Sequence, residues 1–85
     1  MVDETRQTFD RASELAALIV VRRKALGLRQ EDLADLAGVS HRFVQALEAG
    51  KETVRLDKLL AVLHALGWQL AVADSRAGDS RAGKR

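Results

Sequence analysis

Polar side chains that can read and hold nucleic acid lie close together in this chain, at Ser40, His41, Arg42 and Gln45. The guanidinium of Arg42 is a planar fork of donors that matches O6 and N7 of guanine, which makes it the best candidate for a bidentate base contact. Gln45 can hydrogen-bond adenine or a phosphate, and His41 can donate to a guanine acceptor or to a backbone oxygen. These groups read bases only if a rigid element carries them into a groove of the duplex.

The element predicted to carry them is a pair of short helices joined by a three-residue turn, over residues 30–50. The first helix buries Leu33, Ala34 and Ala37 at helical spacing. It ends at Gly38, because glycine takes the left-handed conformation that follows a helix without steric cost. The polar side chains then fall in the first turns of the second helix.

The second helix has a start signal of its own. Ser40 offers its hydroxyl as the N-cap, and Val39 and Val44 are spaced to form a hydrophobic staple around the helix start. Val44 and Leu47 are expected to point inward, which leaves the other polar side chains on the outer face. A short helix whose first turn displays base-reading side chains is the recognition helix of a helix-turn-helix.

Apolar residues at helical spacing, each run ended by a glycine, predict four helices, at about 10–26, 30–37, 41–49 and 56–66. Leu15, Ile19 and Leu26 are expected to face inward from the first of them. The fourth helix carries a stripe of leucines: Leu56, Leu59, Leu60, Leu63 and Leu66. The sequence therefore predicts an all-α fold, an orthogonal bundle of four helices that contains the helix-turn-helix.

After Gly67 the periodicity changes from helical to alternating. Trp68, Leu70 and Val72 alternate with smaller or polar residues, which is the pattern of a half-buried strand. Because a lone strand leaves its backbone donors and acceptors unpaired, we expect residues 68–74 to pair with the same strand of a second copy, across a homodimer. The alternative is that Trp68 and Leu70 cap the core and the rest is irregular.

The composition limits the functions that this chain can have. With 85 residues, of which 47% are hydrophobic, one small domain is expected. No cysteine is present, and the two histidines, His41 and His64, belong to no local cluster of metal ligands. His64 shares a helix face with Asp57 and Ala61 and is expected to be a surface residue, since no nucleophile accompanies it. We therefore expect no enzyme, no metal site, no cofactor and no small-molecule ligand.

The ends of the chain differ from its centre. The sequence opens without the features of a signal peptide, and its longest apolar stretch, 15–21, is far too short to span a bilayer, so we expect a cytoplasmic protein with no membrane contact. Residues 1–9 are expected to form a flexible arm before a DNA-binding domain at 10–67. A repeated DSRAG motif and a terminal Lys-Arg pair predict a disordered basic tail over 75–85.

Four pieces of the sequence together resemble the Xre, or lambda-repressor-like, DNA-binding family. They are GLRQEDLA at 27–34, GVS at 38–40, LEAGK at 47–51 and LLAVLHALG at 59–67. The predicted strand directly after the last helix narrows the resemblance to HipB-type antitoxins. The resemblance implies a lambda-repressor-like bundle, a C-terminal strand that pairs across a dimer, and a HipA-like serine/threonine kinase toxin as partner.

The resemblance also implies roles for individual residues. Gln30 matches the family's phosphate-contacting glutamine, and Arg23 and Glu48 match a structural ion pair between the first and third helices. Phe43 is open to two interpretations: it touches a thymine methyl or the sugar–phosphate backbone, or it packs against a neighbouring helix. The residues expected to contact DNA are Arg29, Gln30, Ser40, His41, Arg42, Phe43, Gln45, Lys51 and Arg55.

Arg29 and Arg55 depart from the family pattern, which usually has Thr or Ser just before the second and fourth helices. An arginine cannot cap the helix amides, and its charge opposes the positive end of the helix dipole. We therefore expect a DNA phosphate to dock at each helix start, with the arginine as a second contact. The alternative is that both side chains simply reach into solvent.

The sequence thus favours a dimeric repressor that binds an inverted-repeat operator, controls its own operon and acts as the antitoxin of a HipA-like kinase. A two-fold dimer would present its recognition helices to half-sites about 34 Å apart. One alternative is a stand-alone Xre-family regulator without a toxin partner. Another is a protein-interaction module that has lost DNA binding, against which the expected exposure of His41, Arg42 and Gln45 argues.

Overall fold

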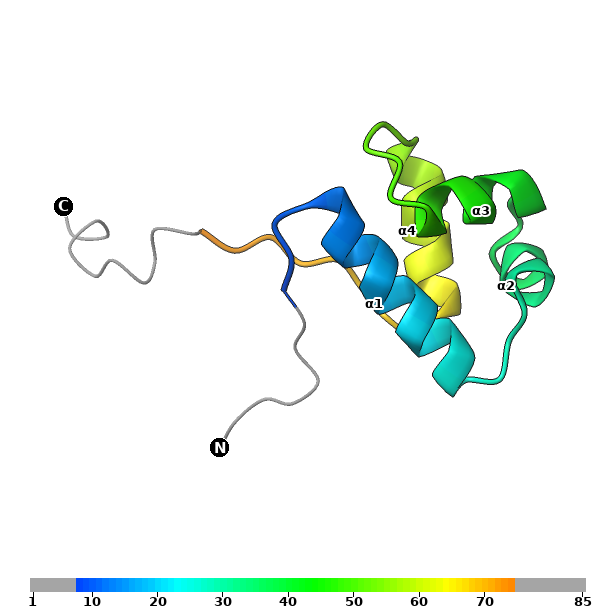
Figure 1. Ribbon diagram of the computed structural model, residues 1–85. Coiled ribbons are helices and arrows are strands. Elements are labelled where there is room, and N and C mark those ends of the chain that lie inside the picture. The colour runs from blue at the N-terminus through cyan, green and yellow to red at the C-terminus, as the bar shows by residue number, and fades with distance from the viewer. Residues whose placement is uncertain (1–7, 75–85) are drawn as a thin grey trace, which may run out of the picture.

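The computed structural model describes residues 8–74 of the chain, whose course is shown in Figure 1. Most of the predicted flexible arm and the whole of the predicted basic tail, 75–85, lie outside the described residues. The described part contains four helices: α1 (Ala12–Ala25), α2 (Gln30–Ala37), α3 (His41–Glu48) and α4 (Leu56–Ala65). The prediction of an all-α fold with four helices is confirmed for this part of the chain.

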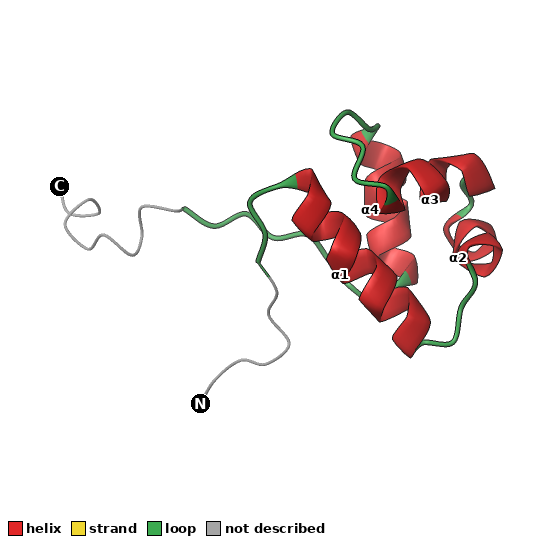
Figure 2. Cartoon of the chain, in the orientation of Figure 1, coloured by secondary structure: helices red, strands yellow, loops and turns green. Residues whose placement is uncertain are grey.

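The four helices enclose one core, to which each contributes a fully buried residue. Ile19 of α1, Leu33 of α2, Val44 of α3 and Val62 of α4 have no exposed surface. Helix α2 contacts both α3 and α4, and α1 contacts α3. In Figure 2, α2 is seen nearly end-on while α3 lies across the view, so the two helices of the pair are steeply inclined to each other. The core therefore fixes the direction in which α3 points.

The turn between α2 and α3 forms from the local signals in its sequence. Gly38 has a φ of +73°, the left-handed conformation that ends α2. The hydroxyl of Ser40 accepts the N–H of Phe43 at 3.0 Å and so caps α3, as predicted. Val39 packs against the core cluster that contains Val44, the two residues for which a hydrophobic staple was predicted.

Two predicted core residues lie at helix ends and are exposed instead. Leu26 directly follows α1 and is 45% exposed, because the chain has left the helix there and no longer follows its buried stripe. Leu56 is the first residue of α4 and is 59% exposed, since the apolar contacts of α4 with the core begin at Leu59. Val62, which lies outside the predicted leucine stripe, is fully buried.

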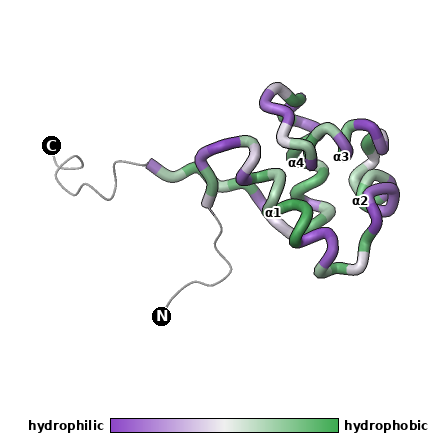
Figure 3. The backbone as a smooth tube through the Cα atoms, in the orientation of Figure 1, coloured by the Kyte–Doolittle hydropathy of each residue, from purple (hydrophilic) through white to green (hydrophobic). Residues whose placement is uncertain are grey.

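The segment after α4 forms no strand within the single described chain, so the strand predicted over 68–74 is not present in this form. Trp68 is half-buried against the core, and its N–H donates to the carbonyl of Leu63 at 2.8 Å. Leu70 is 41% and Val72 96% exposed, and Figure 3 colours this stretch largely hydrophobic. A strand needs a neighbour to satisfy its backbone groups, and residues 8–74 of one chain offer none.

Candidate nucleic-acid interface

The first turns of α3 expose three polar side chains on one face. His41, Arg42 and Gln45 are all exposed, whereas Val44 and Leu47 on the opposite face are 0% and 4% exposed. Within residues 8–74 the side chain of Arg42 makes no hydrogen bond or ion pair. Its five N–H donors are therefore available to an external acceptor. The structure thus brings these three predicted residues together on one surface.

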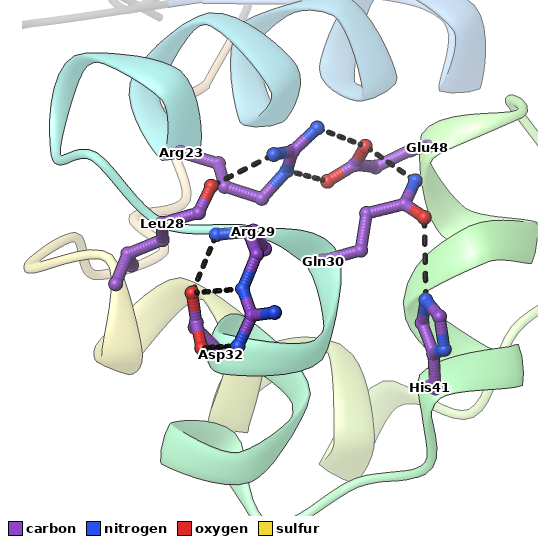
Figure 4. A network of polar contacts seen from close by, with 7 residues as sticks. All are labelled: Arg23, Leu28, Arg29, Gln30, Asp32, His41 and Glu48. Atoms are coloured by element: carbon purple, nitrogen blue, oxygen red, sulfur yellow. Dashed lines mark hydrogen bonds and ion pairs between the residues drawn. The ribbon is translucent and has the colours of Figure 1, made fainter.

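A chain of polar contacts runs from the edge of the core to this exposed turn, as Figure 4 shows. Arg23 of α1 donates to both carboxylate oxygens of Glu48 at the end of α3, from Nε at 2.6 Å and from Nη2 at 3.0 Å. Gln30, the first residue of α2, donates from Nε2 to Oε1 of Glu48 at 2.9 Å. Oε1 of Gln30 in turn lies 3.4 Å from Nε2 of His41. The contacts link three helices.

Arg23 and Glu48 form the buried part of this chain of contacts. Their side chains are 10% and 5% exposed, and Nη1 of Arg23 also donates to the carbonyl of Leu28 at 2.8 Å. Among the described residues no buried side-chain nitrogen or oxygen lacks a partner, as the cost of an unpaired buried charge requires. The ion pair joins α1 to α3, which is the structural role that the resemblance implies.

Arg29 folds back onto the helix that it precedes. Its Nη2 and Nε donate to the carboxylate of Asp32 at 3.0 and 3.1 Å, and its Nη1 lies 3.7 Å from Glu31. Asp32 also accepts the backbone N–H of Arg29 at 2.8 Å, which is the half of a capping box that the third helical residue supplies, while the Arg29 side chain offers the first-turn amides no acceptor. The hydrogen bond from the Arg29 side chain is the main reason why the pKa of Asp32 lies below its ordinary value.

Arg55 makes the corresponding contact at the start of α4. Its Nη2 and Nε donate to Asp57 at 2.7 and 3.1 Å, and the pKa of Asp57 is lowered mainly by hydrogen bonding to this side chain. Both arginine side chains are thus paired with an aspartate while they remain largely exposed, 73% for Arg29 and 68% for Arg55. To contact a phosphate, each guanidinium has to leave its aspartate or share its donors with it.

Phe43 packs against the core and faces α4. It is half-buried, and the ammonium of Lys58 lies 5.9 Å from the centre of its ring, within the range of a cation–π contact. Packing against a neighbouring helix, one of the two interpretations of Phe43, is thus what the free chain shows. Lys58 was not among the predicted site residues, and no local pattern could have indicated it, because only the packing of α4 beside α3 brings the two together.

The remaining predicted cation, Lys51, lies in the loop that follows α3. Its side chain is exposed and makes no ion pair within the described residues. In residues 8–74 no group of three or more histidines or carboxylates is placed to hold a metal ion. None of the described helices combines the length and the apolar character needed to cross a membrane.

Comparison with known proteins agrees with this geometry. A family model for the helix-turn-helix, HTH_3, matches residues 19–71. An uncharacterized HTH-type transcriptional regulator, y4mF of Sinorhizobium fredii, is 43% identical over 60 residues, which are 71% of this chain and 79% of that protein.

Solved structures resemble the chain as well. A chain of the HipA–HipB–O2–O3 complex has a TM-score of 0.74 over 82% of this chain and 99% of its own length, at 20% identity. At that identity the likeness is one of fold alone. The clp gene regulator ClgR from Corynebacterium glutamicum has a TM-score of 0.61 and 31% identity, over 68% of this chain and 62% of the ClgR chain.

The matched segment, 19–71, contains α2, α3 and α4 entire. The exposed first turn of α3 lies where a helix-turn-helix presents its recognition helix to the major groove. Regulators of this kind are not enzymes; they act by binding DNA. The chain belongs to the helix-turn-helix family of DNA-binding transcriptional regulators.

Proposed function

We propose that this chain is a sequence-specific repressor in which the first turns of α3 read base edges in the major groove. The observation that carries the proposal is the division of α3 into a buried face and an exposed polar face. Arg42 is the reader of guanine, because its guanidinium is exposed and unpaired among the described residues. Gln45 bonds adenine or a phosphate. Cations and donors around the turn hold the DNA backbone: Arg29, Gln30, Ser40, Lys51 and Arg55.

The repressor acts as a homodimer in this proposal. Leu70 and Val72 are exposed in the single chain, and alternation places them on the same side of an extended segment. Pairing of residues 68–74 with the same segment of a second copy would supply the neighbouring strand that an extended segment needs and would cover both side chains. A two-fold dimer would then bind an inverted repeat with half-sites about 34 Å apart.

The proposal also assigns a partner, a HipA-like serine/threonine kinase toxin, with the chain as its cytoplasmic antitoxin and as the regulator of their shared operon. Its support is the likeness of fold to a chain of the HipA–HipB–O2–O3 complex, which extends over nearly the whole of that chain. A stand-alone regulator is the second candidate. It is favoured by the relatives of higher identity, y4mF and ClgR, which are named as regulators alone.

Two experiments test the proposal: the first tests DNA readout, and the second separates an antitoxin from a stand-alone regulator. Selection of bound duplexes from a random pool at low salt should enrich an inverted repeat. If no sequence is enriched, the chain is instead an interaction module without DNA readout. Isolation of the native protein from its host, with the companion identified by mass spectrometry, should yield a HipA-like kinase. Isolation of the protein alone favours the stand-alone regulator.

A further inference from the structure

In the chain of polar contacts that ends at His41, Glu48 decides which atoms donate and which accept. The Glu48 carboxylate has no hydrogen to donate, and it accepts from Arg23 and from Gln30. The Gln30 amide must therefore turn its nitrogen toward Glu48, at 2.9 Å. Its oxygen is then the atom that faces His41, 3.4 Å from Nε2 of the imidazole (Figure 4).

An amide oxygen accepts hydrogen bonds and does not donate them, so it stabilises a proton on the nitrogen that faces it. In the neutral imidazole only one of the two nitrogens carries a proton, and the hydrogen bond made by one nitrogen sets the state of the other. With Nε2 protonated, Nδ1 holds a lone pair. Figure 4 draws Nδ1 on the side of the ring away from Gln30, and His41 is exposed.

We infer that Glu48, acting through Gln30, holds His41 in the tautomer with its proton on Nε2, so that His41 offers Nδ1 to DNA as a hydrogen-bond acceptor. This inference rests on the proposed function for its DNA part. It reverses the expectation that His41 donates to guanine. An acceptor at this position selects a base with an exocyclic amino group, adenine N6 or cytosine N4, over the O6 and N7 acceptors of guanine. Glu48 and Gln30 are thus positioning residues for a specificity contact.

The tautomer is measured on the free protein, without DNA. Long-range ¹H–¹⁵N correlation spectra at about pH 8.5, where histidine side chains are neutral, distinguish a proton on Nε2 from one on Nδ1. His64 is exposed, its imidazole makes no hydrogen bond within residues 8–74, and it serves as the reference in the same spectrum. We expect His41 to be protonated on Nε2 alone and to become like His64 in the Gln30→Met variant. Identical patterns for both histidines, or a His41 pattern unchanged by Gln30→Met, would overturn the inference.

The readout is measured separately on a duplex obtained by selection. Each adenine is replaced in turn by purine, which lacks the N6 amino group. At the position that His41 contacts in each half-site, this replacement should reduce wild-type affinity about five- to tenfold, the range of a single hydrogen bond. The same replacement should leave the affinity of a His41→Ala variant unchanged; the corresponding cytosine replacement is tested with a base that lacks N4. The acceptor assignment is wrong if no amino group on the duplex contributes more to the affinity of the wild type than to that of His41→Ala. If no duplex is bound at all, the proposed function fails, whatever the tautomer.

Discussion

The guanidinium of Arg23 and the carboxylate of Glu48 meet at 2.6 and 3.0 Å between α1 and the end of α3. Both side chains are almost fully buried. Since Glu48 is the last residue of α3, this pair fixes the end of the recognition helix opposite to its exposed first turn. The orientation of α3, on which the proposed reading of DNA depends, is therefore held by a buried ion pair at the far end of the helix.

Removal of one partner of this pair should destabilise the fold strongly. Glu48→Ala leaves a buried guanidinium without its counter-charge and is expected to lower the free energy of unfolding by about 3–5 kcal/mol. The matched control, Glu52→Ala at an exposed position, should change it by no more than about 0.5 kcal/mol. Urea unfolding followed by circular dichroism measures both. Equal, small effects of the two substitutions would show that the ion pair does not hold α3.

Gly67 and Gly38 should respond differently to the same substitution. Both have positive φ, +82° and +73°, which costs any L-residue about 1–2 kcal/mol. A Cβ at Gly38 meets no atom within 4 Å, whereas one at Gly67 lies 3.2 Å from Nη2 of Arg22. Arg22 is held by its hydrogen bond to the carbonyl of Leu66 at 2.9 Å and by its position 5.9 Å from the ring of Trp68.

Gly67→Ala is therefore expected to lower the free energy of unfolding by more than Gly38→Ala does. In an Arg22→Ala background the difference between the two glycine substitutions should disappear. Thermal or urea unfolding of the four variants gives the comparison. A persistent difference without Arg22 would mean that the arginine is not what the added methyl group meets.

The pairs at the helix starts predict a specific response to acid. Because pairing lowers the pKa of Asp32 and Asp57 in the fold, each pair stabilises the fold fully above the ordinary pKa of an aspartate. That stabilisation is lost as the pH falls through the lowered pKa. In Arg29→Ala the pKa of Asp32 should rise toward its ordinary value while that of Asp57 stays the same. Carboxyl ¹³C titration measures both groups, and an unmoved Asp32 would contradict the pairing.

If the chain dimerises through residues 68–74, one charged residue introduced into this segment should disrupt the dimer. Val72→Asp places a carboxylate in the proposed interface and should convert a dimer to a monomer in sedimentation experiments. Val21→Asp is the control, since Val21 is also exposed, at 67%, but lies on α1. A wild-type protein that sediments as a monomer at micromolar concentration, or a Val72→Asp protein that remains a dimer, would exclude this interface.

Local signals in the sequence predicted most of the fold. Gly38 and Ser40 fixed the end of α2 and the start of α3, because a left-handed glycine and a capping hydroxyl act on their own neighbours. Helical periodicity wrongly predicted burial of Leu26 and Leu56, because burial at a helix end depends on where the other helices lie. The strand predicted over 68–74 is absent from the described part of the single chain, because a strand requires a neighbouring strand and none lies beside this segment.

The candidate site also contains features that the sequence could predict and others that only the packing of the helices creates. Exposure of Arg42 followed from the apolar face of α3, and Asp32 stands at the right spacing to have indicated the pair with Arg29. The contact of Gln30 with His41, and the approach of Lys58 to Phe43, arise only when helices distant in sequence pack together. No spacing along the chain encodes them.

The central claim, that the first turn of α3 reads bases while the surrounding cations hold the backbone, is tested by comparing Arg42→Ala with Lys51→Ala on a selected duplex and its single-base variants. We predict that Arg42→Ala loses about 1–3 kcal/mol of binding free energy and relaxes the preference at one base pair per half-site. Lys51→Ala should weaken all duplexes equally and lower the salt slope by about 1. If Arg42→Ala also weakens every duplex equally and leaves the base preferences intact, α3 does not read DNA through this turn.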